Sequence, residues 1–351
     1  MNRRKFIISG SLLSTSILVS NISATKLPFR SELKPLKPAK LKPGATVGIV
    51  APAGFIKEDA LNETIENLEN LGLKPYYTDK ILERTGYLGG SDEDRASDLN
   101  HMFTNDKVDA IFAARGGYGC ARMLDKINYD AVKSNPKIVI GYSDITALLY
   151  ALYAKTGLVC FHGPVGISTF NEFSVDYMKK VLMETSSPIV LESHEEAYNS
   201  DDEEYRFDVI NSGVTSGILA GGNLSIVASL VGTPYDIDLK GKILFLEEID
   251  EDPYRVDRML TQMELAGKFD GVKGFALGVF KSCELSEEEK LEGKSFTLKE
   301  VLSDRLSKYN VPTLYGLSFG HVTNKFTLPF GINAELNVNN RTLTLLESAV
   351  V

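Results

Sequence analysis

Residues 137–150 read Lys-Ile-Val-Ile-Gly-Tyr-Ser-Asp-Ile-Thr-Ala-Leu-Leu-Tyr. The four residues Lys137–Ile140, rich in Ile and Val, follow a proline and predict a short buried strand. Gly141 ends that run, and from Asp144 onward the apolar residues have helical spacing. Ser143 is therefore predicted on a strand-to-helix turn, at the open end of a sheet and near the positive end of a helix.

Ser143 has two interpretations at this position. Enzymes that transfer acyl groups place a nucleophile on such a turn, because backbone N–H groups there bind a developing oxyanion. Serine is also a preferred first residue of a helix, where its hydroxyl caps free N–H groups. This stretch alone leaves both interpretations open, and the rest of the chain favours the nucleophile.

The composition is that of an ordinary globular protein. The chain has 351 residues, long enough for two domains, with 43% hydrophobic and 24% charged residues. A net charge of -9 argues against nucleic acid or an anionic membrane surface as the main partner. The three cysteines are widely spaced, and no two of the four histidines have the spacing of a metal-binding pair. We therefore expect neither a disulfide framework nor a metal site.

The first 44 residues do not have the pattern of a folded domain. Arg3, Arg4 and Lys5 precede an apolar run from Ile8 to Val19 that is too short to span a membrane as a stable helix. Residues 1–24 thus resemble a twin-arginine export signal and predict a periplasmic protein. An uncleaved leader that tethers the chain to a membrane is the alternative. Residues 25–44 are rich in Lys and Pro and are predicted to be a tether.

Residues 45–170 predict an α/β domain. Strand and helix patterns alternate along this segment, which indicates a parallel sheet flanked by helices, of flavodoxin or Rossmann type. Ligands of such sheets bind beyond the carboxyl ends of the strands, where Gly116, Gly117 and Ser143 are expected. The predicted strands are 46–50, 74–77, 108–113 and 138–140; the predicted helices are 59–71, one beginning after the cap at Ser91, one from Ala121 and one from Asp144.

The second half of the chain has a different pattern of apolar and polar residues. Residues 171–210 are predicted to be a linker, with a helix over 175–183 and an exposed acidic stretch over 192–206. Residues 211–351 predict a β-rich α+β domain, because short apolar runs with glycine-rich turns predominate. The expected strands include 236–238, 242–246, 275–280, 332–338 and 343–346, and the expected helices are 253–266 and 297–306.

The glycine-rich segment Arg115–Gly119 lacks the order of glycines of a dinucleotide fingerprint. Glycines at a strand end expose backbone N–H groups, so this segment is either part of an oxyanion hole or a plain tight turn. Arg115 is suited to bind a substrate carboxylate through two hydrogen bonds. A surface salt bridge is the equally simple alternative.

The segment Lys242–Asp250 ends an apolar strand in the pair Glu247 and Glu248. Neighbouring side chains on a strand point in opposite directions, so one of the two can enter a cleft while the other is solvated. A fully solvated strand end is the simpler interpretation.

A serine nucleophile needs a base, and only four histidines are available. His321 follows Gly320 at the end of an apolar run, and His162 is its competitor. Ser143, a glutamate and His321 occur in the chain order of α/β-hydrolases, although here the three would be divided between two domains.

Five motifs together resemble the LD-carboxypeptidases, the serine peptidases of the muramoyltetrapeptide carboxypeptidase type, whose relatives include the microcin C self-immunity proteins. Each motif alone is weak, but their order over residues 44–345 is specific. They are Arg115-Gly116-Gly117-Tyr118-Gly119, Gly141-Tyr142-Ser143-Asp144, Gly221-Gly222-Asn223-Leu224, Leu246-Glu247-Glu248 with Pro253-Tyr254-Arg255-Val256-Asp257-Arg258-Met259-Leu260, and Phe319-Gly320-His321.

The resemblance implies a triad of Ser143 as nucleophile, His321 as base and Glu247 as orienting carboxylate. It places the active site between an N-terminal α/β domain and a C-terminal β-rich domain. The backbone N–H groups of Gly116 and Asp144 would form the oxyanion hole. Arg115 and Asn223 are the expected substrate-binding residues.

The expected reaction is hydrolysis of the L-to-D peptide bond that releases terminal D-alanine from a murein tetrapeptide, without a metal or organic cofactor. One alternative is hydrolysis of a peptidyl-nucleotide amide, as in the microcin immunity relatives. The other is an exported protein that binds a small ligand without turnover. The family's usual member is cytoplasmic, so a cytoplasmic location is the alternative to export. A membrane contact is expected only through an uncleaved leader, and a homodimer is left open.

Overall fold

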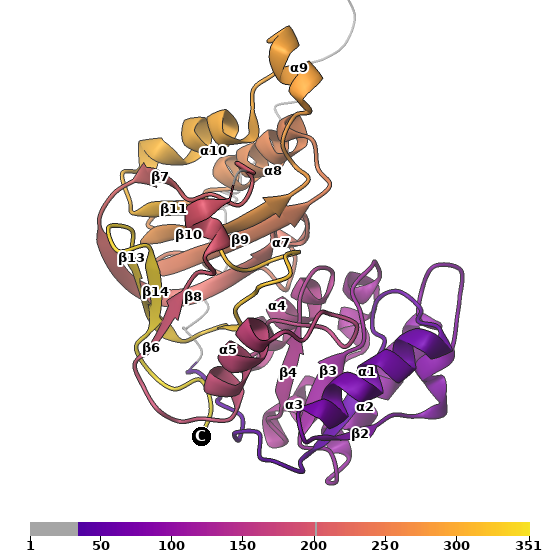
Figure 1. Ribbon diagram of the computed structural model, residues 1–351. Helices are drawn as coiled ribbons and strands as arrows, with labels where there is room; N and C mark the ends of the chain where they lie inside the picture. The colour runs from indigo at the N-terminus through magenta and orange to yellow at the C-terminus, as the bar shows by residue number, and fades with distance from the viewer. Residues whose placement is uncertain (1–33, 201) are drawn as a thin grey trace, which may run out of the picture. The chain divides into compact units, whose positions relative to one another are not determined.

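A computed structural model describes residues 34–200 and 202–351, and these belong to one compact unit (Figure 1). The predicted export signal, residues 1–24, lies outside the described residues, as does the first part of the predicted tether. In the described part of the chain, every helix is too short or too polar to cross a membrane.

The first sheet is parallel apart from one short edge strand, as predicted for this half. Its strand order is β12-β5-β4-β3-β1-β2, and only β12 runs antiparallel to its neighbour. The strand order reverses direction between β1 and β3, as in flavodoxin-like sheets. Strands β1, β3 and β4 are almost wholly buried, which explains their unbroken runs of apolar residues. The strands are β1 (Thr46–Val50), β2 (Lys74–Tyr76), β3 (Ala110–Ala113), β4 (Ile138–Gly141), β5 (Phe161–His162) and β12 (Leu328–Pro329).

Helices connect these strands. Ser91 caps helix α2, and its hydroxyl accepts the Asp94 N–H at 3.0 Å, as the sequence predicts. Helices α2, α3 and α4 contact one another in turn and form a layer along the sheet. The predicted helix from Ala121 is instead a 3₁₀ segment followed by short α3. The helical segments are α1 (Glu58–Asn70), η1 (Asp79–Leu82), α2 (Asp92–Thr104), η2 (Cys120–Lys126), α3 (Tyr129–Ser134), α4 (Ile145–Thr156) and α5 (Glu172–Leu182).

The second sheet has the order β6-β14-β13-β8-β9-β10-β11-β7. Its central strands β8, β9, β10 and β11 are parallel, so their carboxyl ends meet at one edge. The outer strands are antiparallel. The strands are β6 (Ile189–Glu192), β7 (Asp208–Asn211), β8 (Val214–Asn223), β9 (Lys242–Ile249), β10 (Gly274–Lys281), β11 (Thr313–Leu317), β13 (Asn333–Asn337) and β14 (Thr342–Leu345).

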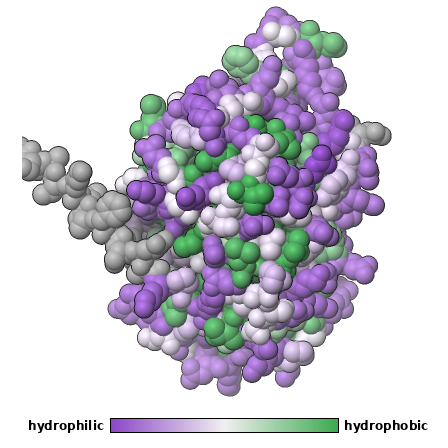
Figure 2. Space-filling view, turned by 90° about the vertical axis from the view of Figure 1, so that its left-hand side faces the viewer, coloured by the Kyte–Doolittle hydropathy of each residue, from purple (hydrophilic) through white to green (hydrophobic). Residues whose placement is uncertain are grey.

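Helices α8 and α10 pack against each other beside the parallel part of the second sheet (Figure 1). On the face turned towards the viewer in Figure 2, hydrophobic residues gather near the middle and hydrophilic ones surround them. Val190 on β6 and Val209 on β7 are among the exposed apolar side chains of this sheet. The remaining helical segments are α6 (Glu196–Asn199), α7 (Leu224–Leu230), α9 (Glu287–Glu292), α10 (Leu298–Leu306), α8 (Pro253–Leu265) and η3 (Ser307–Tyr309).

Three expectations about connecting segments are corrected. The described end of the predicted tether packs on the fold, because Leu36 N–H bonds to Gly157 O at 2.8 Å and Leu41 is buried. The predicted linker 171–210 contains α5, β6, α6 and β7, and β6 and β7 are the two edge strands of the second sheet. The expected strand at 236–238 is absent from the described fold.

Candidate active site

Ser143 lies on the turn between β4 and α4, as predicted. Its φ is +63°, a left-handed conformation that is uncommon for a residue with a side chain. The position before the first residue of α4 belongs to Asp144, and the Ser143 hydroxyl bonds to none of the described residues. The capping interpretation of Ser143 is therefore wrong. A serine held in a strained turn with a free, half-buried hydroxyl is typical of a nucleophile.

Gly116 packs directly against this serine. A Cβ atom built on Gly116 would lie 2.8 Å from Ser143 Cβ and 3.0 Å from Ser143 Oγ. Contacts this short do not occur between carbon atoms, so only glycine fits here without displacing the hydroxyl. The backbone of the Arg115–Gly119 segment thus borders the hydroxyl, where the predicted N–H donors of Gly116 and Asp144 would be needed.

The side chain of Asp144 holds this segment in place. Its carboxylate accepts the Cys120 N–H at 2.8 Å, and burial raises the pKa of the group although N–H donors of Cys120 and Gly119 oppose that rise. From the other side, Arg95 donates to Gly119 O at 2.9 Å. Sequence reasoning assigned Asp144 only a backbone role and did not identify Arg95.

Glu247 and His321 meet at the carboxyl edge of the second sheet. Glu247 lies two residues before the end of β9, and His321 follows β11. Glu247 Oε2 lies 2.8 Å from His321 Nδ1. Burial raises the pKa of Glu247, but the hydrogen bond with His321 and the charges of His321 and His162 outweigh it and leave that pKa below its ordinary value. Glu247 is thus a buried carboxylate that stays ionised and orients one imidazole.

Gly320 makes this approach possible. Its φ is +105°, and a Cβ atom built on it would lie 2.8 Å from both Cβ and Oε2 of Glu247. Any other residue at 320 would push the histidine loop away from the carboxylate.

Glu248 corrects the expectation of a solvated partner. It is 2% exposed, and its oxygens accept the Asn223 side-chain N–H at 2.8 Å and the Ser225 N–H at 2.7 Å. Burial, together with the charge of Glu247, raises the pKa of Glu248 to about 7. Both glutamates are therefore buried, one towards His321 and the other at the start of α7.

Direct contacts join the two sheets behind the site. Asn223 N–H donates to Thr146 Oγ1 at 3.1 Å, and a Cβ atom on Gly222 would lie 2.5 Å from the Thr146 methyl group. The glycine pair before Asn223 therefore lets the end of β8 lie against the first turn of α4. This contact sets the serine turn relative to the Glu247 strand.

Tyr142 lies between the two parts of the site. Its ring is edge-on to the His321 imidazole with 4.8 Å between centroids, and the Lys325 ammonium lies 4.6 Å from the Tyr142 ring centre. Burial lowers the pKa of Lys325 to about 8, against the opposing charge of Glu247. Ser143 and His321 are not hydrogen-bonded to each other here, although His321 contacts the residue before the serine. Sequence reasoning missed the roles of Tyr142 and Lys325, whose only signal is that Tyr142 belongs to the serine motif and Lys325 follows His321 by four residues.

The competing base His162 is buried beneath this region. It is 1% exposed, neither ring nitrogen has a partner among the described residues, and burial lowers its pKa to about 4. Since it has no carboxylate partner, it lacks the support that His321 receives from Glu247.

The two predicted substrate-binding residues, Arg115 and Asn223, differ in how many of their polar atoms are already hydrogen-bonded within the protein. Arg115 is half-buried and donates only to the backbone oxygens of Gly116 and Phe55, at 3.3 and 3.4 Å; among the described residues it forms no salt bridge. Both polar atoms of the Asn223 side chain are engaged, with Glu248, Ser225 and the Ile226 N–H. A substrate contact through the Asn223 side chain stays a prediction. It would require Asn223 to give up one of these hydrogen bonds in favour of the substrate.

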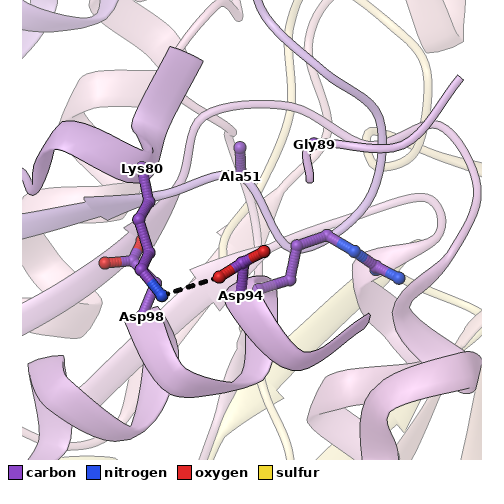
Figure 3. A pocket seen from close by; sticks show the side chains of 6 residues that line it. Ala51, Lys80, Gly89, Asp94 and Asp98 are labelled. Atoms are coloured by element: carbon purple, nitrogen blue, oxygen red, sulfur yellow. Dashed lines mark hydrogen bonds and ion pairs between the residues drawn. The ribbon is translucent and has the colours of Figure 1, made fainter. Parts of the chain in front are cut away.

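A pocket near the end of β1 is a separate feature. It is lined by Ala51, Lys80, Gly89, Asp94, Arg95 and Asp98. Lys80 bonds to Asp94 at 2.9 Å across it (Figure 3), and its interior does not admit even a water molecule. It includes none of the predicted site residues. Within residues 34–200 and 202–351, no three His, Cys, Asp or Glu side chains are grouped as metal ligands.

A strained serine turn, a glycine-rich loop beside it and a His–Glu pair with a buried carboxylate are together typical of a serine hydrolase. Comparison with known proteins defines the class further. Residues 47–163 match the model of the LD-carboxypeptidase N-terminal domain, and residues 216–336 match that of the LD-carboxypeptidase C-terminal domain. The chain belongs to the LD-carboxypeptidase family, and it is a carboxypeptidase.

Individual relatives agree with this assignment. The chain is 35% identical over 314 residues to the probable murein peptide carboxypeptidase of Bacillus subtilis, covering 88% of this chain and 94% of the relative. The solved muramoyltetrapeptide carboxypeptidase of Oxalobacter formigenes has a TM-score of 0.73 and 30% identity, covering 87% of this chain and 99% of that one. The wild-type microcin C7 self-immunity protein has a TM-score of 0.80 and 27% identity, covering 90% of this chain and all of that one, 100%.

Proposed function

We propose that this chain is a serine LD-carboxypeptidase that releases the terminal D-alanine of murein tetrapeptides, with Ser143, His321 and Glu247 as its triad. One observation carries the proposal: the His321–Glu247 pair, 2.8 Å apart, contacts the residue that precedes a strained serine. The names of the carboxypeptidase relatives support the substrate class.

In the proposed mechanism, Ser143 Oγ attacks the carbonyl carbon before the terminal D-alanine. Because Nδ1 of His321 is bound to Glu247, Nε2 is the nitrogen left to take the serine proton. The same nitrogen then gives that proton to the departing amino group. Proton transfer requires Oγ and Nε2 to come into contact, and catalytic hydrogen bonds of this kind often tighten only when the substrate binds.

The N–H groups of Gly116 and Asp144 would stabilise the oxyanion, with roughly 3–4 kcal/mol from each donor. D-Alanine leaves, and a water molecule, activated by His321 in the same way, hydrolyses the acyl-enzyme and restores Ser143. Glu247 keeps the imidazole in the productive tautomer and stabilises its protonated form. All of these steps use side chains and backbone groups of this chain, with no cofactor.

A second candidate function is hydrolysis of a peptidyl-nucleotide amide. The likeness to the microcin C7 self-immunity protein, with a TM-score of 0.80, favours it. Stacking on a nucleobase calls for an aromatic side chain, and the sequence has no Trp. Tyr or Phe would have to supply that contact, so the murein tetrapeptide is the preferred substrate.

We also propose export to the periplasm, on the sequence pattern of residues 1–24 alone. Cell fractionation of the full chain and of a variant with Arg3 and Arg4 both replaced by Lys tests this. Export of the full chain, with the variant retained in the cytoplasm, is the expected result; a cytoplasmic full chain would contradict it.

Mass spectrometry of purified murein tetrapeptides tests the proposed activity. Incubation with the intact protein should remove the mass of one alanine, whereas the Ser143→Ala variant should leave the peptide unchanged over the same period. Loss of the nucleophile typically costs about 10⁶-fold in turnover. Alanine release at a comparable rate by the variant would exclude Ser143 as the nucleophile.

A further inference from the structure

The loops after β1 and β3 lie at the place where the strand order of the first sheet reverses. Ligands of open α/β sheets bind at that place, beyond the carboxyl ends of the strands. The β3 loop carries Arg115 and Gly116, and the β1 loop carries Gly54 and Phe55. Their contacts bear on how a substrate is held beside Ser143.

Two arginines converge on Phe55. The guanidinium of Arg84 lies over the Phe55 ring, 3.9 Å from its centre, and Arg115 donates to Phe55 O at 3.4 Å. Arg84 also donates to Gly86 O at 2.9 Å. Among the described residues neither arginine has a carboxylate partner, although the chain holds 47 acidic against 38 basic residues. Two neighbouring unpaired cations repel each other and attract an anion.

The pair adjoins the nucleophile through glycine contacts. A Cβ atom built on Gly54 would lie 3.2 Å from Gly116 O and 3.5 Å from Arg115 Nε. Gly116 in turn packs on Ser143 Oγ. In a peptide cleaved before its last residue, the terminal carboxylate lies one residue beyond the scissile carbonyl, and consecutive Cα atoms are about 3.8 Å apart. A receptor for that carboxylate therefore has to lie near the serine, and Arg115 immediately precedes the glycine that packs on Ser143.

We propose that Arg84 and Arg115, held around Phe55, form the receptor for the C-terminal carboxylate of the substrate and so make this hydrolase a carboxypeptidase. The inference rests on the proposed function and deepens it. An arginine stacked on an aromatic ring keeps its N–H edge free for a carboxylate, and the stacking fixes its orientation. Arg115 contributes the second set of donors, so the anion is held between two charges.

Equilibrium binding in the Ser143→Ala background tests this inference without turnover. The ligands are a murein tetrapeptide with a free C-terminal carboxylate and the same peptide with a C-terminal amide, which keeps every other carboxylate. Arg84→Gln should weaken binding of the acid by roughly tenfold, and Arg115→Gln by more, because Arg115 is the less exposed of the two. Binding of the amide should change by less than about twofold.

Arg341→Gln is the matched control, since Arg341 also lies over aromatic rings, 5.3 Å from the centre of Phe207, but on the second sheet's hairpin. It should bind both peptides as the background protein does. Equal losses for acid and amide in the Arg84 and Arg115 variants, or no loss for either, would overturn the inference. Failure of the proposed function is seen separately, as absence of alanine release by the intact protein, and the inference would fall with it.

Discussion

The carboxyl edges of the two sheets contribute different parts of the candidate site, and they are built in different ways. At the first sheet, one continuous segment supplies β4, the Ser143 turn and α4. The serine backbone is strained, and its hydroxyl bonds to none of the described residues. At the second sheet, Glu247 lies on β9 and His321 lies in the loop after β11. β10 separates these two strands, and the two side chains are already bonded at 2.8 Å. The nucleophile is thus prepared by local backbone geometry, whereas the base is prepared by the topology of a sheet.

The two edges differ in how rigid they have to be. Glu247 is buried and His321 is half-buried, so their hydrogen bond operates in a medium of lower dielectric constant than water. The serine turn is half-buried and has to remain open to a peptide. Substitutions on the two edges should therefore differ in their effects on kcat and on the free energy of unfolding.

Of the three substitutions below, replacement of the Glu247 carboxylate should lower kcat most. Glu247→Gln keeps the shape, but its amide N–H can donate to His321 Nδ1 and so place the imidazole proton on Nε2, where a base needs a lone pair. The value of kcat should fall by about 10⁴-fold, as measured by alanine release, while the thermal midpoint shows that the fold persists. A loss below tenfold would show that the second-sheet edge is not needed for catalysis.

A change beneath the serine turn should have a smaller effect. Asp144→Ala removes the acceptor of the Cys120 N–H and frees the Gly116 segment. We expect kcat to fall by about 10²-fold and the free energy of unfolding by about 1–3 kcal/mol.

Asp144→Asn is the matched control for that variant, because it retains an acceptor of the same shape at the same place. It should recover most of both losses in the same kinetic and urea-denaturation measurements. If the alanine variant turned over substrate as fast as the intact protein, the carboxylate would not position the segment.

The smallest effect on activity is expected at His162. Its pKa is lowered by burial to about 4 in the folded state, so the unfolded chain takes up a proton first as the pH falls below about 6.5. This group therefore adds stability above pH 6.5 that is lost as the pH falls towards 4, at up to about 1.4 kcal/mol per pH unit.

His162→Phe should remove that contribution, because both ring nitrogens lack partners and the ring lies among Tyr142, Phe245 and Phe319. Urea denaturation gives the free energy of unfolding at pH 5 and at pH 7. The increase between these two pH values should be about 2 kcal/mol smaller in the variant, and its kcat should stay within a few-fold of the intact protein. A collapse of kcat without loss of stability would make His162 the base after all.

The serine turn at the edge of the first sheet could be predicted from the sequence, because the residues that form it are consecutive in the chain. The change from strand to helical spacing around Gly141 is enough to place Ser143 on a turn. The glycine-rich loop was also recognisable, but its contact with Ser143 depends on β3 and β4 being neighbours, and its anchorage by Asp144 and Arg95 cannot be read from spacing.

The second edge was predicted only as separate residues and through the family resemblance. Glu247 and His321 are 74 positions apart, and their contact depends on the order of β9, β10 and β11 and on the left-handed backbone of Gly320. The burial of Glu248 was missed because its partners, Asn223 and Ser225, come from the end of β8 and the start of α7. Alternation along a strand gives the direction of a side chain, not what covers it.

The most direct test of the account is whether the two edges act as one unit. Alanine release from a murein tetrapeptide should be measured at high enzyme concentration for Ser143→Ala, Glu247→Gln and the double variant. We predict that the double variant is no slower than Ser143→Ala alone, because the carboxylate and the base act only through the serine. A double variant slower by the product of the two single losses would contradict the shared mechanism.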